Sequence, residues 1–252
     1  MHRFCYLGLA AACGTSPAVA ATCNADSGMQ RAALVELYTS EGCSSCPPAD
    51  ARLNTLGGDP RVIPLALHVG YWDGLGWHDR FARDGHAGRQ RALVSATGGA
   101  TVYTPHFFIN GKPLLEWRER LDALIAQPLR QTASLRLQLL ATVAGPGRVR
   151  FSVTVSPPPA DSGALQLLVG LSEDGLTSKI AAGENRGALL KHDHVVRVLS
   201  APLAIPAGGG TLTQTLTLPD DAGTRLRAVA FVQRAGTLDV VQAVQSPSCT
   251  LR

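Results

Sequence analysis

The sequence contains no run of basic residues, no internal repeat and, beyond its first 20 residues, no long apolar segment. Its 23 Lys and Arg residues are scattered singly, and with 19 Asp and Glu residues they leave a formal net charge of +4. Nucleic-acid binding is excluded as a function class, because it relies on basic residues gathered in a run or on one face. We also expect no membrane span, since a spanning helix needs about 20 consecutive apolar residues.

What the sequence does contain is enough apolar material for a buried core. Of its 252 residues, 45% are hydrophobic and 17% are charged, which is the composition of a globular chain rather than a disordered or fibrous one. This length predicts one or two domains, and we expect two.

The amino terminus has the features of a secretory signal peptide. A short positive segment at residues 1–3 precedes an apolar run at residues 4–12, and Ala18 and Ala20 stand at the spacing that signal peptidase reads. We expect cleavage after Ala20, which makes residues 1–20 a signal peptide and the mature chain periplasmic or secreted. A lipoprotein signal ending at Cys13 is the alternative interpretation.

The cysteines fit an oxidising compartment, where disulfides persist. Removal of the signal takes away two of the six cysteines and leaves Cys23, Cys43, Cys46 and Cys249. Two members of this even set lie close together, and two lie near opposite ends of the chain. We therefore predict a disulfide between Cys43 and Cys46 and a structural disulfide between Cys23 and Cys249.

The first half of the mature chain alternates strands and helices. Residues 34–39 are rich in strand-forming side chains, and the two prolines after the cysteine pair favour a helix at residues 46–56. The other expected elements are a strand at 62–69, a helix at 79–96, a strand at 106–110 that enters a hairpin turn at Asn110-Gly111, and a helix at 116–125. This order is that of an α/β domain, which we place at residues 21–128.

After residue 128, apolar residues recur at every second position. The expected strands lie at residues 135–139, 149–155, 165–171, 195–199, 211–218, 226–233 and 240–244. Such alternation is typical of strands with one buried face, and about seven short strands separated by turn residues favour a β-sandwich. We place this all-β domain at residues 129–252.

The Cys43-Ser44-Ser45-Cys46 motif at the start of the expected helix is the main candidate for chemistry. Free backbone N–H groups and the positive end of the helix dipole stabilise a thiolate there and lower its pKa from about 8.5 to roughly 3.5–7.5. Cys43 would be the attacking nucleophile and Cys46 the resolving thiol. A plain structural disulfide and half of a zinc site are the alternatives, although the sequence has no second Cys-x-x-Cys motif.

A strand, a Cys-x-x-Cys motif on a helix and Thr104-Pro105 before a later strand together resemble the thioredoxin-like superfamily. The resemblance implies that the Thr104–Pro105 bond is cis, that Pro105 keeps metals off the dithiol, and that the Thr104 backbone pairs with substrate chains. It also implies the fold class, an α/β thioredoxin-like N-terminal domain followed by an all-β sandwich-like C-terminal domain.

Longer motifs resemble an uncharacterised family of bacterial secreted proteins, and the resemblance implies architecture rather than substrate. They are residues 36–50, 68–73, 75–77, 103–105, 183–187 and 194–197. His106 departs from the family pattern, in which a Gln follows the Thr-Pro pair. It places an ionisable ring beside the proline.

Thioredoxins and periplasmic disulfide oxidases carry a buried acid near the position of Glu36. This carboxylate is either a proton acceptor for Cys46, because burial raises a carboxyl pKa toward the working pH, or a plain strand residue. Tyr71 and Trp72, which follow the second expected strand, either line a peptide groove or simply pack their loop. His192 and His194 are either a metal pair or part of a hydrogen-bonded turn.

Together these residues predict a thiol–disulfide oxidoreductase that acts on exported protein thiols or disulfides, or on small disulfides, without a cofactor. One alternative is a copper(I)-binding protein in which the dithiol joins His68 or His106, since soft thiolates select that ion. The other is a redox-inert thioredoxin-like protein whose β-domain binds a partner.

Overall fold

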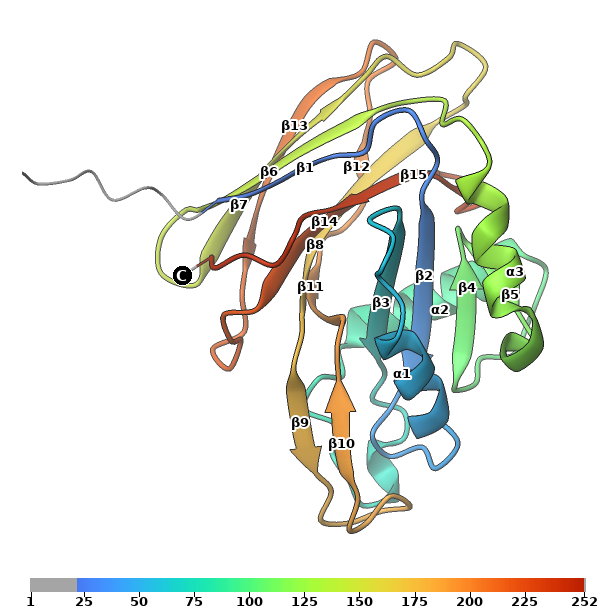
Figure 1. Cartoon of the computed structure of the whole chain (residues 1–252), viewed down its shortest axis with the longest axis vertical. Coiled ribbons are helices and arrows are strands. Elements are labelled where there is room, and N and C mark those ends of the chain that lie inside the picture. Colours follow the sequence, from blue (N-terminus) through green and yellow to red (C-terminus); the bar gives the residue numbers. More distant parts are fainter. Residues whose placement is uncertain (1–21, 252) are drawn as a thin grey trace, which may run out of the picture.

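The computed structural model describes residues 22–251, and its largest element is a nine-stranded mixed sheet (Figure 1). The strands run in the order β15-β14-β8-β11-β3-β2-β4-β5, with β12 paired to β8. Their bounds are β2 Ala33–Thr39, β3 Val62–His68, β4 His106–Ile109, β5 Lys112–Leu114, β8 Leu165–Glu173, β11 Val195–Leu199, β12 Leu203–Ala204, β14 Leu226–Arg234 and β15 Val240–Gln245. Within the described residues, the β2–β3 and β3–β11 pairings of this sheet are parallel, and its other pairings are antiparallel.

A four-stranded sheet and a separate hairpin complete the strands. The four-stranded sheet has the order β1-β6-β7-β13, with bounds β1 Thr22–Asp26, β6 Leu137–Val143, β7 Arg148–Val155 and β13 Gly210–Thr217. The hairpin pairs β9, Leu176–Lys179, with β10, Leu189–His192. In Figure 1 the hairpin extends from the lower edge of the large sheet.

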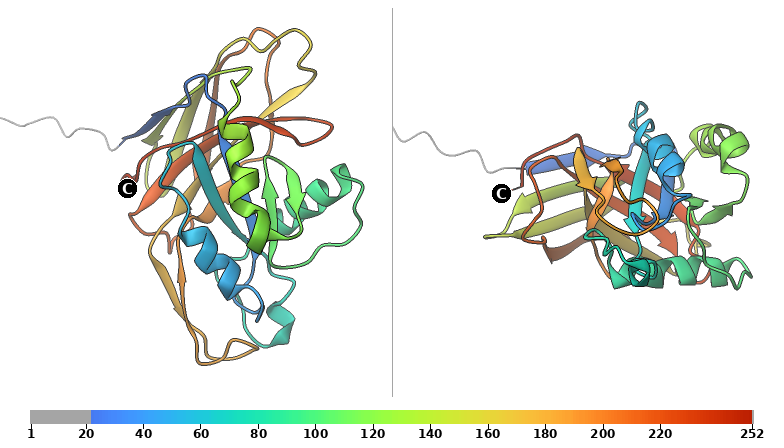
Figure 2. Two further views of the ribbon diagram at one scale, coloured as in Figure 1. Left: turned by 45° about the vertical axis from the view of Figure 1, so that its right-hand side comes forward. Right: turned by 90° about the horizontal axis from the view of Figure 1, so that it is seen from below.

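The helices cover the two faces of the large sheet over the part formed by β3, β2, β4 and β5 (Figure 2). Their bounds are α1 Pro47–Asn54, α2 Asp84–Ala96, α3 Trp117–Leu129 and the short 3-10 helix η1 Asp73–Leu75. Val35 and Leu37 of β2 pack in one core with residues of α1 and α3, whereas Leu34 and Tyr38 pack with α2. Successive side chains of a strand point to opposite faces, so α2 lies opposite α1 and α3.

The expected fold class, an α/β thioredoxin-like domain followed by an all-β sandwich-like domain, is wrong. The structure is mostly β, and strands from both halves of the sequence form one sheet. Strand β11 pairs with β3 in parallel, and β1 from the beginning of the described chain pairs with β6. The sequence pattern identified many of the strands, but alternation along a strand does not show which strand becomes its neighbour.

Strand β2 is enclosed on every side. All seven of its residues are buried, because it lies between β3 and β4 with helices on both faces. The hairpin from β4 to β5 turns at Asn110 and Gly111, whose φ angles are 48° and 84°. The Asn110 side chain accepts a hydrogen bond from the Leu34 N–H at 2.8 Å, so the predicted turn also fixes the start of β2.

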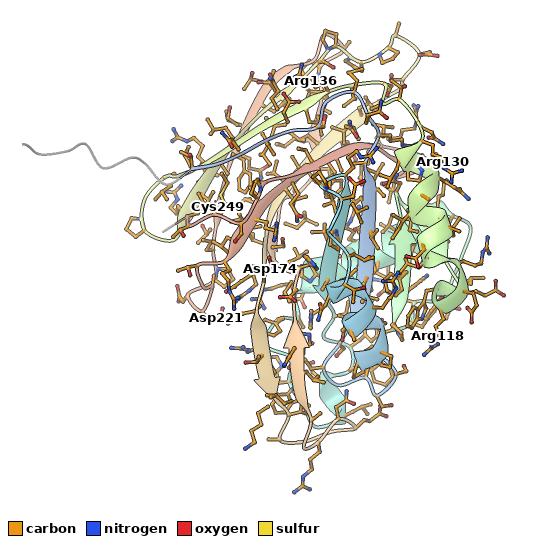
Figure 3. All side chains as sticks on the ribbon, in the orientation of Figure 1. Arg118, Arg130, Arg136, Asp174, Asp221 and Cys249 are labelled. Atoms are coloured by element: carbon orange, nitrogen blue, oxygen red, sulfur yellow. A yellow bond between two sulfur atoms is a disulfide. The ribbon has the colours of Figure 1, made fainter. Side chains whose placement is uncertain are left out.

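A disulfide joins Cys23 to Cys249 across a sequence separation of 226 residues, with Cα atoms 5.7 Å apart. Cys23 is on β1, and Cys249 exchanges backbone hydrogen bonds with Leu226 at the start of β14 (Figure 3). Together with the Cys43–Cys46 disulfide, this bridge indicates an oxidising, exported environment. The expected signal peptide at residues 1–20 and the lipoprotein alternative at Cys13 lie outside the described residues.

Between residues 22 and 251, none of the helices is both long and apolar enough to cross a membrane.

Replacing Cys23 and Cys249 by Ser will lower the free energy of unfolding without reducing the Cys43–Cys46 pair. The disulfide restricts the unfolded chain, and closing a loop of this length is worth at most about 5 kcal/mol in chain-entropy models. Urea unfolding of the double variant and of the parent protein measures the difference. Equal stability of the two proteins would show that the bridge has no structural role.

Candidate functional site

The dithiol lies in the turn between β2 and α1. Cys43 and Cys46 are joined by a disulfide, and their Cα atoms are 5.4 Å apart. Cys46 is the N-cap residue of α1, with helical φ and ψ of −78° and −40°, and its carbonyl accepts the N–H groups of Ala49 and Asp50. Pro47 begins the helix where a missing N–H costs nothing, which explains why the helix starts directly after the second cysteine.

Thr104 and Pro105 lie next to the first cysteine, and the bond between them is cis, as the resemblance implies. The Thr104 carbonyl oxygen is 3.8 Å from Cys43 Sγ. Trp72 donates its indole N–H to the Thr104 hydroxyl at 2.7 Å. The structure therefore brings Cys43, Thr104, Pro105 and Trp72 together.

Tyr71 and His106 are the sequence neighbours of Trp72 and Pro105, and they contact other side chains. Tyr71 is 43% exposed and donates its hydroxyl to Gln90 on α2. His106 is buried and stacks on Tyr103 with ring centroids 4.1 Å apart. Burial lowers the pKa of His106 to about 4, so its ring is neutral near pH 7.

Glu36 is not brought to the dithiol. Its side chain lies on the α2 face of the sheet, where Arg89 donates to its two carboxylate oxygens at 2.6 and 3.0 Å. The α1 helix covers the other face, because Val35 and Leu37 point there. Glu36 is thus a buried ion-pair partner of Arg89, and the structure offers another acid near Cys46.

That acid is Asp50, which was not among the site residues predicted from the sequence. It stands four residues after Cys46 in α1, so the two side chains share one face of the helix, and both are buried. Burial raises the pKa of Asp50 above its ordinary value. A polar residue in the first turn of a helix is usually exposed, and only its place inside the motif at residues 36–50 distinguished it in the sequence.

Asp50 belongs to a buried cluster of acids and histidines at the ends of β2 and β3. Its other members are Glu41, His68, Asp79 and His192. The His68 and Asp79 side chains meet at 2.7 Å, and Asp79 also accepts the Glu41 backbone N–H at 2.9 Å. Burial opposes charge on His68, but the carboxylates of Asp79, Asp50 and Glu41 together outweigh it and raise the His68 pKa.

The two histidines near β11 do not form a metal pair. His192 lies 3.3 Å from Glu41, whereas His194 has a positive φ of 62° and lies 3.4 Å from Asp174. Within residues 22–251, no three or more His, Cys, Asp or Glu side chains, those of the buried cluster included, are arranged so that they could hold a metal ion. His68 is engaged by Asp79, and neither nitrogen of His106 has a hydrogen-bond partner within the described structure.

The β9–β10 hairpin covers the dithiol loop, and neither of its strands was predicted from the sequence. Asn185 at its tip donates to the backbone carbonyls of Glu41 and Cys43, each at 2.9 Å. The neighbouring Glu184 carboxylate accepts the Ser44 N–H at 3.0 Å, and hydrogen bonding from the Ser44 side chain and backbone lowers the Glu184 pKa. These hydrogen bonds fasten the tip to the backbone of the dithiol loop.

Both sulfurs are consequently shielded from solvent. Cys43 is 1% exposed and Cys46 is fully buried, whereas Ser44 and Ser45 between them are exposed. In this structure neither cysteine is open to contact from solvent.

The geometry defines a class of protein with one large mixed sheet, two disulfides and a covered dithiol at a helix start. A family model described as a protein of unknown function (DUF1223) matches residues 34–233. The chain belongs to this family. None of the curated proteins compared with the chain matches it.

Two solved structures resemble this chain over most of its length. The crystal structure of a protein from Agrobacterium tumefaciens is 25% identical, with a TM-score of 0.61 over 85% of this chain and 93% of that one. HBP35 of Porphyromonas gingivalis is 17% identical, with a TM-score of 0.62 over 86% of this chain and 75% of that one. At this lower identity, the likeness concerns the fold alone.

The Asp50→Asn variant will gain stability relative to the parent protein as the pH rises. The pKa of Asp50 is raised in the folded state, so the protonated form stabilises the fold at low pH and this contribution is lost as the carboxyl ionises. Asn is neutral throughout and does not lose it. Urea unfolding between about pH 4 and pH 7 measures the difference, with exposed Asp161→Asn as a control that changes little. A difference that shrinks toward pH 7 would contradict the assignment.

The Asn185→Ala variant will let dithiothreitol reduce the Cys43–Cys46 disulfide faster. It removes the two hydrogen bonds that hold the hairpin tip to the dithiol loop. Each is worth about 0.5–1.5 kcal/mol, so the two together correspond to about 1–3 kcal/mol and a rate increase of roughly fivefold to 150-fold. Stopped-time thiol labelling measures the rate, and Asn24→Ala on β1 is the matched control. An unchanged rate would mean that the hairpin does not limit access.

Proposed function

We propose that this protein is a thiol–disulfide oxidoreductase that acts on exported proteins or small disulfides through Cys43 and Cys46. The observation that carries the proposal is the disulfide at the amino end of α1, with the cis Thr104–Pro105 bond beside Cys43. A helix start stabilises the thiolate that thiol exchange requires. We also propose that the mature protein is periplasmic or secreted, where such partners occur.

In the reduced protein, the Cys43 thiolate attacks one sulfur of a partner disulfide. A Cys43–partner bond forms, the partner disulfide breaks, and its second sulfur leaves as a thiolate that takes up a proton. Cys46 then gives up its proton and attacks the Cys43 sulfur, which releases the other partner sulfur. Two electrons pass to the partner, and the reverse sequence oxidises a partner dithiol.

Asp50 is the acid best placed to accept the Cys46 proton. The two buried side chains share a helix face, and a carboxyl with a raised pKa exchanges protons closer to neutral pH than an ordinary one. Glu36 is less suited, because its carboxylate is bound by Arg89 on the opposite face.

The redox-inert alternative is supported by the burial of both sulfurs. A disulfide that is never exposed behaves as a structural bridge, whatever its sequence. The two functions differ in whether Cys43 captures a partner, which makes trapping the deciding experiment.

Reduced Cys46→Ala protein will form a stable mixed disulfide with glutathione disulfide, because it retains the attacking thiolate and lacks the resolving thiol. Cys43→Ala protein will form little or none, since Cys46 lies within the helix start and is fully buried. Intact-mass spectrometry detects the adduct, and titration of thiolate absorbance should place the Cys43 pKa below about 8.5. Absence of an adduct in both variants would overturn the oxidoreductase proposal in favour of the inert bridge.

A further inference from the structure

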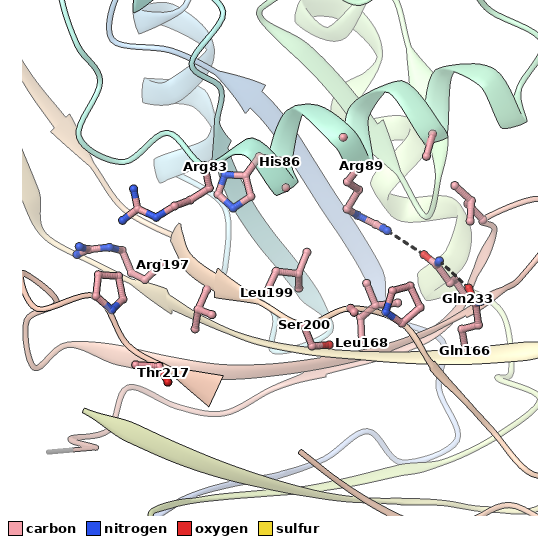
Figure 4. A pocket seen from close by; sticks show the side chains of 18 of the residues that line it. Arg83, His86, Arg89, Gln166, Leu168, Arg197, Leu199, Ser200, Thr217 and Gln233 are labelled. Atoms are coloured by element: carbon pink, nitrogen blue, oxygen red, sulfur yellow. Dashed lines mark hydrogen bonds between the residues drawn. The ribbon is translucent and has the colours of Figure 1, made fainter. Parts of the chain in front are cut away.

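A cavity of about 870 Å³ lies on the α2 face of the large sheet (Figure 4). Helix α2 forms one wall, and β8 and β11 form the opposite wall. The segments at residues 200–202 and 217–219 close further sides. Its volume falls in the range of sites that enclose small organic molecules.

The middle of this cavity is apolar. Leu168 and Leu199 lie across from α2 in Figure 4, and Ala92 of α2 also lines the space. Two glycines, Gly85 and Gly88, line it from the same helix, and a Cβ added at either would meet no atom within 4 Å. Glycine within a helix costs up to about 1 kcal/mol relative to alanine, so α2 gives up some stability on the side that faces this space.

The lining residues include three arginines and no Asp or Glu. Arg89 is already paired with Glu36, and Arg197 is paired with Glu173 and Asp221. Arg83 has no carboxylate partner within the described residues, and it donates instead to the carbonyls of Arg80 and Ala82. One positive charge of the lining is therefore left without a counter-charge.

Arg83 marks one end of the cavity. It is the N-cap residue of α2, and no side chain caps the backbone N–H groups of that helix end. A helix amino terminus and a guanidinium both favour a negatively charged group. His86 lies beside Arg83 in Figure 4, and its Nδ1 is 2.9 Å from the His68 carbonyl, so it donates its proton there.

We infer that this cavity binds a small amphipathic monocarboxylate with an aliphatic body. The carboxylate pairs with Arg83 at the start of α2, and the aliphatic body lies between Gly88 and the Leu168–Leu199 wall. Burial of an aliphatic chain against this wall supplies about 25 cal/mol per Å² of apolar area removed from water. This inference does not depend on the proposed redox function, because the cavity and the dithiol are separate sites.

Titration calorimetry with decanoate tests the inference on the full chain with both disulfides intact. We expect one decanoate per chain, and no comparable binding of decyltrimethylammonium, which has the same tail and the opposite charge. Equal binding of the two amphiphiles would show that the surface is a nonspecific apolar patch and would overturn the inference. So would the absence of decanoate binding.

Two variants locate the site. Arg83→Gln will weaken decanoate binding about tenfold or more, whereas Arg91→Gln, an equal change at an exposed position of the same helix that does not line the cavity, will leave it unchanged. Gly88→Trp will fill the cavity and abolish binding, while both disulfides and the circular dichroism spectrum of the parent protein are retained. Unimpaired binding to both folded variants, Arg83→Gln and Gly88→Trp, would place the ligand elsewhere and overturn the inference.

Discussion

The parallel pairing of β3 with β11 is the contact on which the arrangement of this protein depends. It is short: Val195 is opposite Ala66, and the Ala66 N–H donates to the His194 carbonyl at 2.9 Å. Through it, strands β11, β8, β14 and β15 join strands β3, β2, β4 and β5 in one sheet. One hydrophobic core on the α2 face accordingly contains residues from both halves of the chain, including Tyr38 and Phe231.

The β3–β11 pairing also explains how the covering hairpin reaches the dithiol. β8 and β11 are antiparallel neighbours, and the chain between them forms the β9–β10 hairpin, which extends past the end of the sheet. The hairpin tip then lies over the turn that follows β2. Polar side chains at the ends of the parallel strands β2 and β3, among them Glu41 and His68, are enclosed beneath it. Carboxyl ends of neighbouring parallel strands are where α/β sheets usually place their functional groups.

Local sequence patterns predicted the structural features that are determined by residues close together in the sequence. The strand before the dithiol, the helix start at the prolines, the Asn110-Gly111 turn and the alternating strands all follow from patterns of a few residues. The Cys23–Cys249 bridge followed from the count of cysteines. The β3–β11 pairing could not be predicted in this way, because Val195 and Ala66 are far apart in the sequence and no local pattern indicates that they pair.

The candidate site was predicted only in part for a related reason. Cys43, Cys46, Thr104 and Pro105 stand in short motifs, and the structure brings them together. Assigning Glu36 required knowing which sheet face α1 would cover, and a shift by one residue reverses that answer. Asn185 lies 142 residues from Cys43, and its hydrogen bond to that backbone depends on the whole path of the chain.

The disulfide between Cys23 and Cys249 holds both ends of the described chain at one corner of the molecule. Figure 1 shows this corner beside the four-stranded sheet, away from α1 and the β9–β10 hairpin. A tag or linker attached near either of these cysteines would therefore leave the molecule at the same corner. A chain immobilised on a bead through that corner would expose α1 and the β9–β10 hairpin to the surrounding solution.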